Sequence, residues 1–121
     1  MKLRLLPLLF AAASAVAFAP ATLTGKWQVH NSVEGNESDQ TCTFTQTDSD
    51  LSGSCTSDNG TVTITGKVDG EKITWSYKSE YEGTPLTVEY EGKLAADSTI
   101  SGSVNVPEFS AEGDFTAKRA D

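Results

Sequence analysis

Apolar and polar residues alternate along most of this chain after its first 21 positions. In residues 73–77 (Ile-Thr-Trp-Ser-Tyr) and 86–90 (Leu-Thr-Val-Glu-Tyr), aliphatic or aromatic side chains occupy every second position, with Thr, Ser or Glu between them. Side chains of a β-strand point alternately to the two faces of a sheet, so this pattern predicts strands with one dry and one wet face. The 3.6-residue period of an amphipathic helix is not seen, and we expect one all-β domain.

Turn residues recur roughly every ten positions and divide this pattern into eight strands. The expected strands cover residues 24–33, 40–46, 51–57, 61–68, 71–79, 84–94, 98–106 and 111–119. Asn59-Gly60 and Asp69-Gly70 are strong hairpin signals, because a type I′ turn needs positive φ at both central positions. Eight antiparallel strands can form an up-and-down (meander) barrel or a two-sheet sandwich. We favour the barrel, because pairing the first strand with the last leaves no exposed edge.

The register of the expected hairpins places the apolar side chains on one face. With the two turns named above, Cys55 pairs with Ile64 and Gly66 pairs with Ile73. A slip of one residue would turn a whole strand over, so agreement between hairpins supports the assignment. The predicted interior side chains are Trp27, Val29, Asn31, Val33, Phe44, Leu51, Val62, Ile64, Val68, Ile73, Trp75, Tyr77, Leu86, Val88, Tyr90, Ile100, Val104 and Phe115, with inward glycines at Gly53, Gly66 and Gly102.

Cys42 and Cys55 are the two cysteines of the chain. A four-residue loop at 47–50 sets them opposite each other on neighbouring strands, and we expect a disulfide. Closing a loop of about 14 residues contributes about 3 kcal/mol in the chain-entropy model. Neither a CxxC redox motif nor a thiolate metal site is present, so the expected role is structural.

The first 21 residues have the parts of a secretory signal peptide. Lys2 and Arg4 precede an apolar stretch, which ends in the A-x-A pattern of residues 19–21. We expect cleavage after Ala21, with a cut after Ala19 as the alternative. The apolar run is short for a membrane span of about 20 residues. The expected mature domain, residues 22–121, is therefore exported to the periplasm or the extracellular space.

The mature domain is strongly acidic. Its formal net charge is −10 rather than the −8 of the whole chain, because Lys2 and Arg4 are the charged residues lost with the leader. Such a charge repels nucleic acids and anionic lipid surfaces. We expect no nucleic-acid partner and no membrane insertion, and the oligomeric state is left open.

Several short motifs resemble those of avidin and streptavidin. They are Gly25-Lys26-Trp27, Leu51-Ser52-Gly53-Ser54, Ile64-Thr65-Gly66-Lys67, the inward Trp75 and Tyr90-Glu91-Gly92, set against the G-x-W, L-T-G, inward-Trp and W-x-G pattern of that family. A G-x-W also opens the first strand of lipocalins, so the chain is similar to calycin-type barrels, and to small exported bacterial proteins of unassigned function. The resemblance implies an eight-stranded barrel with a ligand pocket at one mouth.

Polar and aromatic side chains on the inward face are the candidate ligand contacts. The resemblance places Asn31, Trp75 and Tyr77 at the mouth, and strand parity adds Tyr90 and Gln46 as inward polar groups. A dry polar group needs a hydrogen-bond partner, which a small, partly apolar ligand can supply. Because aliphatic residues replace most of the polar groups that hold biotin in avidin, biotin is not the expected ligand. The alternative is a filled barrel that serves as a structural or protein-interaction domain.

The residues give little support for an enzyme. His30, the one histidine, falls on the outward face of its strand, and no nucleophile–base pair is visible. The acidic segments 48–50 and 58–60 lack the remaining ligand spacing of a calcium loop and are interpreted as turns. We therefore expect no enzymatic activity, no metal and no cofactor.

The meander gathers its connections at two ends. Those at about 34–39, 58–60, 80–83 and 107–110 share one end; those at 47–50, 69–70 and 95–97 lie with the termini at the other. The first end carries longer connections and seven acidic residues: Glu34, Glu37, Asp39, Asp58, Glu80, Glu82 and Glu108. We expect any pocket to open there and to prefer a neutral or cationic molecule over an anion.

Overall fold

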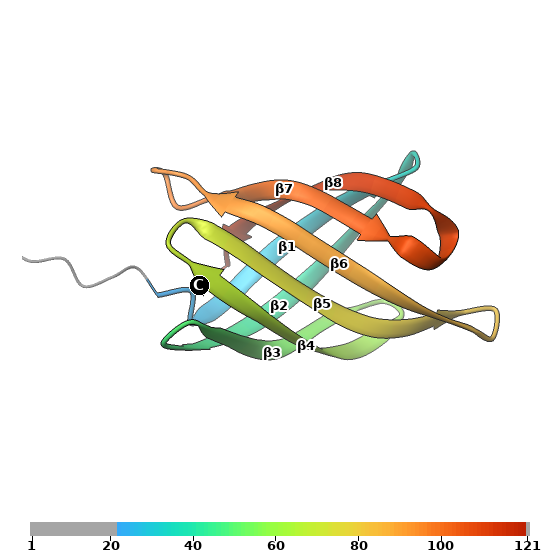
Figure 1. Ribbon diagram of the computed structural model, residues 1–121, viewed down its shortest axis with the longest axis horizontal. Helices are drawn as coiled ribbons and strands as arrows, with labels where there is room; N and C mark the ends of the chain where they lie inside the picture. The colour runs from blue at the N-terminus through green and yellow to red at the C-terminus, as the bar shows by residue number, and fades with distance from the viewer. Residues whose placement is uncertain (1–21, 121) are drawn as a thin grey trace, which may run out of the picture.

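The protein forms a closed barrel of eight antiparallel strands in simple meander order (Figure 1). A computed structural model describes residues 22–120; the expected signal peptide and its cleavage site lie outside these residues. The elements are β1 (Gly25–Val33), β2 (Asn36–Thr47), β3 (Asp50–Ser57), β4 (Gly60–Asp69), β5 (Lys72–Tyr81), β6 (Thr84–Leu94), β7 (Ile100–Val106), the short 3₁₀ helix η2 (Pro107–Phe109) and β8 (Ala111–Arg119). Strand β1 pairs with both β2 and β8, so the barrel is confirmed and the sandwich is excluded.

The connections gather at two ends, as the meander requires. The β1–β2, β3–β4 and β5–β6 turns lie at one end with η2, and the remaining turns lie at the other end with the C-terminus (Figure 1). We call the first of these the hairpin end. The β1–β2 connection there is shorter than expected. It is a two-residue turn at Glu34 and Gly35, whose φ values of 51° and 82° suit a type I′ turn.

The register of β2 and β3 is as predicted: Cys42 lies opposite Cys55, and the two are bonded. The next two hairpins are each displaced by one residue from the predicted turn. Asp58 and Asn59 form the β3–β4 turn, so Cys55 pairs with Val62 and not with Ile64.

The following glycines explain these displacements. Gly60, at φ 114°, takes the positive-φ position after the turn, as in a bulged hairpin. Gly70, at φ 62°, is the first central residue of the β4–β5 turn, where a type II′ turn places glycine, and Gly66 pairs with Trp75 instead of Ile73. Each displacement changes the partner by two positions, which leaves every side chain on its predicted face.

Three inward glycines each lie directly across a ladder from a large ring. Gly53 is opposite Phe44, Gly66 is opposite Trp75, and Gly102 is opposite Phe115. A Cβ added at Gly66 would stand 2.0 Å from the carbonyl oxygen of Thr74. At all three positions an added Cβ would meet the backbone of a neighbouring strand, so the close approach of the strands requires glycine there.

The interior is packed with aromatic and aliphatic side chains, as the strand parity predicts. Phe44, Tyr90 and Phe115 surround the Trp75 ring, at centroid distances of 4.7 to 5.2 Å. The buried apolar residues are Leu23, Trp27, Val29, Cys42, Phe44, Leu51, Cys55, Ile64, Ile73, Trp75, Leu86, Val88, Tyr90, Ile100, Val104, Phe115 and Ala117. Of the predicted interior set, Val33, Val62, Val68 and Tyr77 are only partly buried.

Leu23 closes the end of the barrel that holds the C-terminus. Its carbonyl oxygen accepts a hydrogen bond from Trp27 Nε1 at 2.9 Å, and its N–H donates to Gln46 Oε1 at 2.9 Å. Gln46 Nε2 in turn donates to the carbonyl oxygen of Asp48. The inward Gln46 therefore has hydrogen-bond partners within the chain.

Candidate functional site

The barrel wall is open between β4 and β5 at the hairpin end. Residues 65–69 of β4 pair with residues 72–76 of β5, but residues 60–64 and 77–81 have no partners across this seam. There β4 pairs only with β3, and β5 only with β6. The two strands therefore separate at this end and leave a gap between them.

A cavity of about 800 Å³ occupies this opening, and we call it the mouth cavity. Its lining from inward-facing strand positions comprises Asn31, Ser38, Gln40, Val62, Tyr77 and Ser79. Residues of the outward face border it as well, among them Gln28, Glu37, Asp39 and Thr41, together with Asp58 of the β3–β4 turn, and no Lys or Arg is among its lining residues. The expectation that a pocket opens at the acidic hairpin end therefore agrees with this cavity.

At the mouth cavity five polar side chains form one hydrogen-bond network. Gln40 is its centre: Gln40 Oε1 accepts from the Tyr90 hydroxyl at 3.1 Å, and Gln40 Nε2 donates to the Tyr77 hydroxyl at 3.3 Å. The Asn31 amide donates through Nδ2 to Gln40 Oε1 at 3.5 Å and to Ser38 Oγ at 3.4 Å. Asn31 is 6% exposed and Gln40 is 9% exposed.

One acceptor of this network has no partner. Asn31 Oδ1 is buried and receives no hydrogen bond from the described residues. A buried amide oxygen without a donor costs about 1–3 kcal/mol. Asn31 Oδ1 is therefore the unsatisfied acceptor of this network.

The floor of the site is aromatic. Tyr90 lies parallel to Trp75, with centroids 4.7 Å apart and an interplanar angle of 10°. Burial raises the pKa of the Tyr90 hydroxyl well above its usual value, and the neighbouring Tyr77 raises it further. The hydroxyl therefore stays protonated and serves as a donor.

The four predicted ligand contacts fall into two layers. Asn31 and Tyr77 line the mouth cavity, whereas Trp75 and Tyr90 lie beneath it, with Tyr90 joined to it through Gln40. Trp75 Nε1 is also buried without a partner among the described residues, and nothing in the arrangement assigns it one.

Gln40 and Ser38 belong to the site but are absent from the predicted set. The strand expected from the sequence begins at residue 40, whereas β2 begins at Asn36, so the expectation leaves Ser38 in a loop and Gln40 at a strand end. Continuing the alternation of Phe44 and Cys42 back to residues 40 and 38 places both side chains on the inward face.

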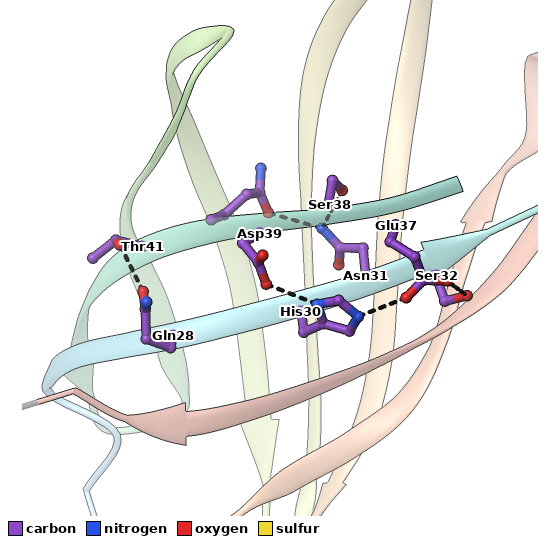
Figure 2. Close-up of polar contacts among 9 residues, drawn as sticks. Gln28, His30, Asn31, Ser32, Glu37, Ser38, Asp39 and Thr41 are labelled. Carbon is purple, nitrogen blue, oxygen red and sulfur yellow. Dashed lines mark hydrogen bonds and ion pairs between the residues drawn. The ribbon is translucent and has the colours of Figure 1, made fainter. Parts of the chain in front are cut away.

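His30 forms hydrogen bonds through both ring nitrogens on the outer face of β1, beside the mouth cavity. His30 Nδ1 lies 2.7 Å from Asp39 Oδ1, and Nε2 lies 2.7 Å from Glu37 Oε1 (Figure 2). Ser32 Oγ donates to the second oxygen of Glu37. The expectation that His30 faces outward is confirmed, since 47% of its side chain is exposed.

These contacts shift the pKa values of His30 and Glu37. The hydrogen bond with Asp39, followed by that with Glu37, raises the pKa of His30 above its ordinary value. The hydrogen bond from Ser32, followed by that from His30, lowers the pKa of Glu37. In mildly acidic solution His30 is therefore an imidazolium ion held between the carboxylates of Asp39 and Glu37.

The opposite side of the β5–β6 hairpin is closed by a side chain. Residues 84–88 of β6 have no partner in β7, but Glu108 of η2 accepts hydrogen bonds from Thr87 N at 2.9 Å and from Thr87 Oγ1 at 3.0 Å. These hydrogen bonds, chiefly that from Thr87 N, lower the pKa of Glu108. The β6 edge of this hairpin is thus covered by Glu108, whereas the β5 edge, which faces β4, borders the opening.

A larger groove of about 1160 Å³ crosses the outer surface over β3 to β8. Its side chains are mainly outward-facing Ser, Thr, Asp and Glu, with Trp75 and Tyr90 contributing to the floor. These groups are solvated, so the mouth cavity, with its buried unpartnered acceptor, is the better candidate site.

Comparison of the chain with family models, curated proteins and solved structures finds no match. None of the helical segments between residues 22 and 120 is long and apolar enough to cross a membrane. The fold and the geometry of the mouth cavity therefore carry the functional argument.

Proposed function

We propose that this protein is an exported calycin-like barrel that binds a small, partly apolar molecule in the mouth cavity. The observation that carries the proposal is the unpartnered Asn31 Oδ1, which is buried at the wall of the cavity. A ligand donor would supply the missing hydrogen bond, while Val62 and the Tyr77 ring would contact its apolar part. Binding is favoured over catalysis, because no activated nucleophile lies among these residues.

The barrel and the position of the cavity support the resemblance to avidin-type and lipocalin-type proteins. The ligand differs, because two amides and two tyrosine hydroxyls, from Asn31, Gln40, Tyr77 and Tyr90, form the polar part of the site. The aromatic core below prevents deep insertion, so the ligand is shallow and small. The disulfide and the leader-like first 21 residues support action outside the cytoplasm.

A second candidate function is a protein-interaction domain. Tyr81 and Phe109 are the exposed large apolar residues of the described chain, 60% and 46% exposed, and they contact each other edge to face at 6.0 Å. They come from the β5–β6 hairpin and from η2, which places an aromatic pair on the hairpin end. If the pair is a partner contact, Tyr81→Ser would abolish complex formation without affecting small-molecule binding.

The main proposal is tested by nuclear magnetic resonance with a panel of neutral and cationic small molecules. We expect millimolar binders to shift the amide signals of Val62, Tyr77 and Ser79. Asn31→Leu, which removes the unpartnered oxygen at similar volume, should weaken binding about tenfold, as expected for a lost hydrogen bond of about 1.4 kcal/mol.

The matched control is Asn105→Leu, on the outer face of β7 and outside the mouth cavity. This variant should bind like the wild type. Val62→Phe, which narrows the opening, provides a second test should Asn31→Leu fail to fold. Shifts confined to the turn at Asp48 and the C-terminus, or no shifts at all, would contradict the proposal.

A further inference from the structure

Two strand edges face each other across the seam between β4 and β5 without pairing. Residues 60–64 of β4 and 77–81 of β5 lie beyond the last pair of their ladder, Thr65 with Ser76. Along an antiparallel strand, the N–H and C=O groups of every second residue point to the same side. The contacts of the neighbouring strands therefore fix which residues direct their backbone groups into the seam.

Thr87 of β6 fixes this orientation for β5. Its N–H donates to Glu108, and so points away from β5. Thr87 lies opposite Lys78. In an antiparallel pair the two residues direct their backbone groups either towards each other or both away from each other. Lys78, and Glu80 two positions later, therefore direct their N–H and C=O groups into the seam.

The same alternation applies to β4. Ser76 lies two positions before Lys78 and shares its orientation, so its partner Thr65 also directs its backbone groups across the ladder. Thr63 and Thr61 continue this orientation past the end of the ladder. Between residues 22 and 120, no backbone or side-chain group is hydrogen-bonded to this edge beyond Thr65 and Ser76. The residues with free backbone donors and acceptors at the seam are thus Thr61, Thr63, Lys78 and Glu80.

The β5 edge of the seam has no cover of its own. Proteins commonly cover or block exposed strand edges, because such edges pair with other chains. The β6 edge of the same hairpin is blocked, since Glu108 accepts the N–H of Thr87 and Pro85 has no N–H to offer. On the β5 edge, the charged Lys78 side chain reaches across to β6, where Nζ donates to Thr87 Oγ1 at 2.9 Å. The edge that faces the seam is therefore left open.

We propose that the β5 edge of the seam binds an extended peptide segment of another protein as an added antiparallel strand. An extended polypeptide carries donors and acceptors at the same two-residue spacing as Lys78 and Glu80. Antiparallel pairing continues the pattern of the barrel and is the more stable arrangement. The inference goes beyond the proposed function, because it concerns a backbone edge and holds whether or not a small molecule binds.

The charge around the seam narrows the choice of partner. Asp58, Glu80 and Glu82 lie in or beside the two hairpins that border it. A basic segment is therefore favoured over an acidic one. Pairing of this edge with that of a second copy is disfavoured, because the domain as a whole is strongly acidic.

The side chains of the added strand alternate between two environments. Those on the inner face lie beside Tyr77 and Ser79, which line the mouth cavity. Val62 and Tyr77 supply partly buried apolar surface there. Those on the outer face lie beside Lys78 and Glu80, in water. The expected partner is therefore a basic segment with an apolar residue at every second position.

The probe is the capped peptide Lys-Thr-Val-Thr-Val-Thr-Lys, and amide hydrogen exchange measured by nuclear magnetic resonance is the readout. In the free protein the amides of Lys78 and Glu80 should exchange at least about tenfold faster than those of Tyr77 and Ser79, which point to β6. Saturating peptide should slow the exchange of Lys78 and Glu80 at least about tenfold. The amide of Thr61, on the β4 edge, should exchange as before.

Glu80→Pro tests the edge from the protein side. It removes an N–H that faces the seam and leaves the ladder with β6 intact, where Glu80 already lies opposite Pro85. Peptide binding should weaken at least about tenfold, because a hydrogen bond is lost and the ring stands in the path of the added strand. Glu80→Ala is the matched control. It removes the charge but keeps the N–H, and it should weaken binding by at most about threefold.

Methylated peptides provide a test that leaves the protein unchanged. With the valines facing inward, the N–H groups of the threonines point to β5 and those of the valines point away from it. Methylation of the three threonine nitrogens should therefore abolish the slowed exchange of Lys78 and Glu80. Methylation of the two valine nitrogens should preserve it. These two peptides also provide the decisive comparison should Glu80→Pro fail to fold.

The outcomes separate this inference from the proposed function. A peptide that slows no amide of the β5 edge, or equal binding of the two methylated peptides, overturns the inference. Slow exchange of Lys78 and Glu80 in the free protein also overturns it, because β4 and β5 would then close the seam by themselves. Small-molecule binding at the mouth cavity without peptide binding leaves the proposed function intact, and peptide binding without any small-molecule binding leaves this inference intact.

Discussion

Gly66 lies directly opposite Trp75 in the β4–β5 ladder, and the backbone of β5 lies so close to it that a side chain at position 66 has no room. An added Cβ would meet the Thr74 carbonyl oxygen at 2.0 Å and Trp75 Cβ at 2.8 Å. Because the first contact is with backbone, no rotamer change relieves it.

Gly66→Ala should therefore lower the free energy of unfolding by about 1–3 kcal/mol, as overpacking does in other cores. Thr65→Ala, at the exposed neighbouring position, should change it by less than about 0.5 kcal/mol. Urea titrations of both variants provide the measurement. Equal urea midpoints for Gly66→Ala and Thr65→Ala would show that β4 and β5 can move apart at this point without a loss of stability.

Removing the Trp75 ring tests the packing from the other side. Trp75→Ala deletes a side chain that is 2% exposed and contacts three other rings, so we expect a loss of about 3–5 kcal/mol in a urea titration. Trp75→Phe keeps an aromatic ring and should cost less. A loss below about 1 kcal/mol for the alanine variant would place Trp75 outside the core.

The barrel was predictable from the sequence because a period of two fixes the face of each side chain. One residue of error in a turn changed the partners of Cys55 and Gly66 but not their faces. Turn geometry was less predictable. Asn59-Gly60 signals a type I′ turn in isolation, yet Gly60 takes the positive-φ position that follows the turn.

The polar part of the site was predicted in part. Asn31, Tyr77 and Tyr90 follow from parity alone, since each lies on a strand with a clear alternation. Gln40 did not, because the polar run from Asn36 to Gln40 has no alternation that marks it as strand. The same run hid the His30 contacts, which depend on β2 continuing beside β1 as far as Asn36.

The disulfide between Cys42 and Cys55 joins two directly paired residues of β2 and β3. The double variant Cys42→Ala/Cys55→Ala should lose about 2–4 kcal/mol of stability, because the unfolded chain is no longer constrained. The wild type under reducing conditions should lose a similar amount. Mass spectrometry that finds two free thiols in unreduced exported protein would contradict the bond itself.

The Tyr90 hydroxyl donates to Gln40 Oε1 at 3.1 Å in a buried setting. Tyr90→Phe keeps the stack on Trp75 but removes this donor, and we expect a loss of about 0.5–1.5 kcal/mol. The loss is modest because Gln40 Oε1 still accepts from Asn31 Nδ2. Denaturant titration is the measurement, and a variant as stable as the wild type would show that the bond contributes nothing net.

The stability of the protein should depend on pH through His30. The pKa of His30 is raised in the folded protein above its ordinary value of 6.5, because Asp39 and then Glu37 hydrogen-bond its ring. A group whose pKa is raised on folding stabilises the protein fully below its unfolded pKa, and this stabilisation is lost as the pH rises through the folded value.

The urea midpoint of the wild type should therefore exceed that of His30→Gln near pH 5.5, and the difference should shrink toward pH 8. Glu37 remains ionised over this range, since the hydrogen bonds from Ser32 and His30 lower its pKa. Lys118→Gln removes a positive charge from the same outer face. The difference in urea midpoint between this variant and the wild type should stay constant over the pH range in which His30 titrates. A difference between wild type and His30→Gln that is constant with pH would mean that Asp39 and Glu37 do not hold the imidazolium in solution.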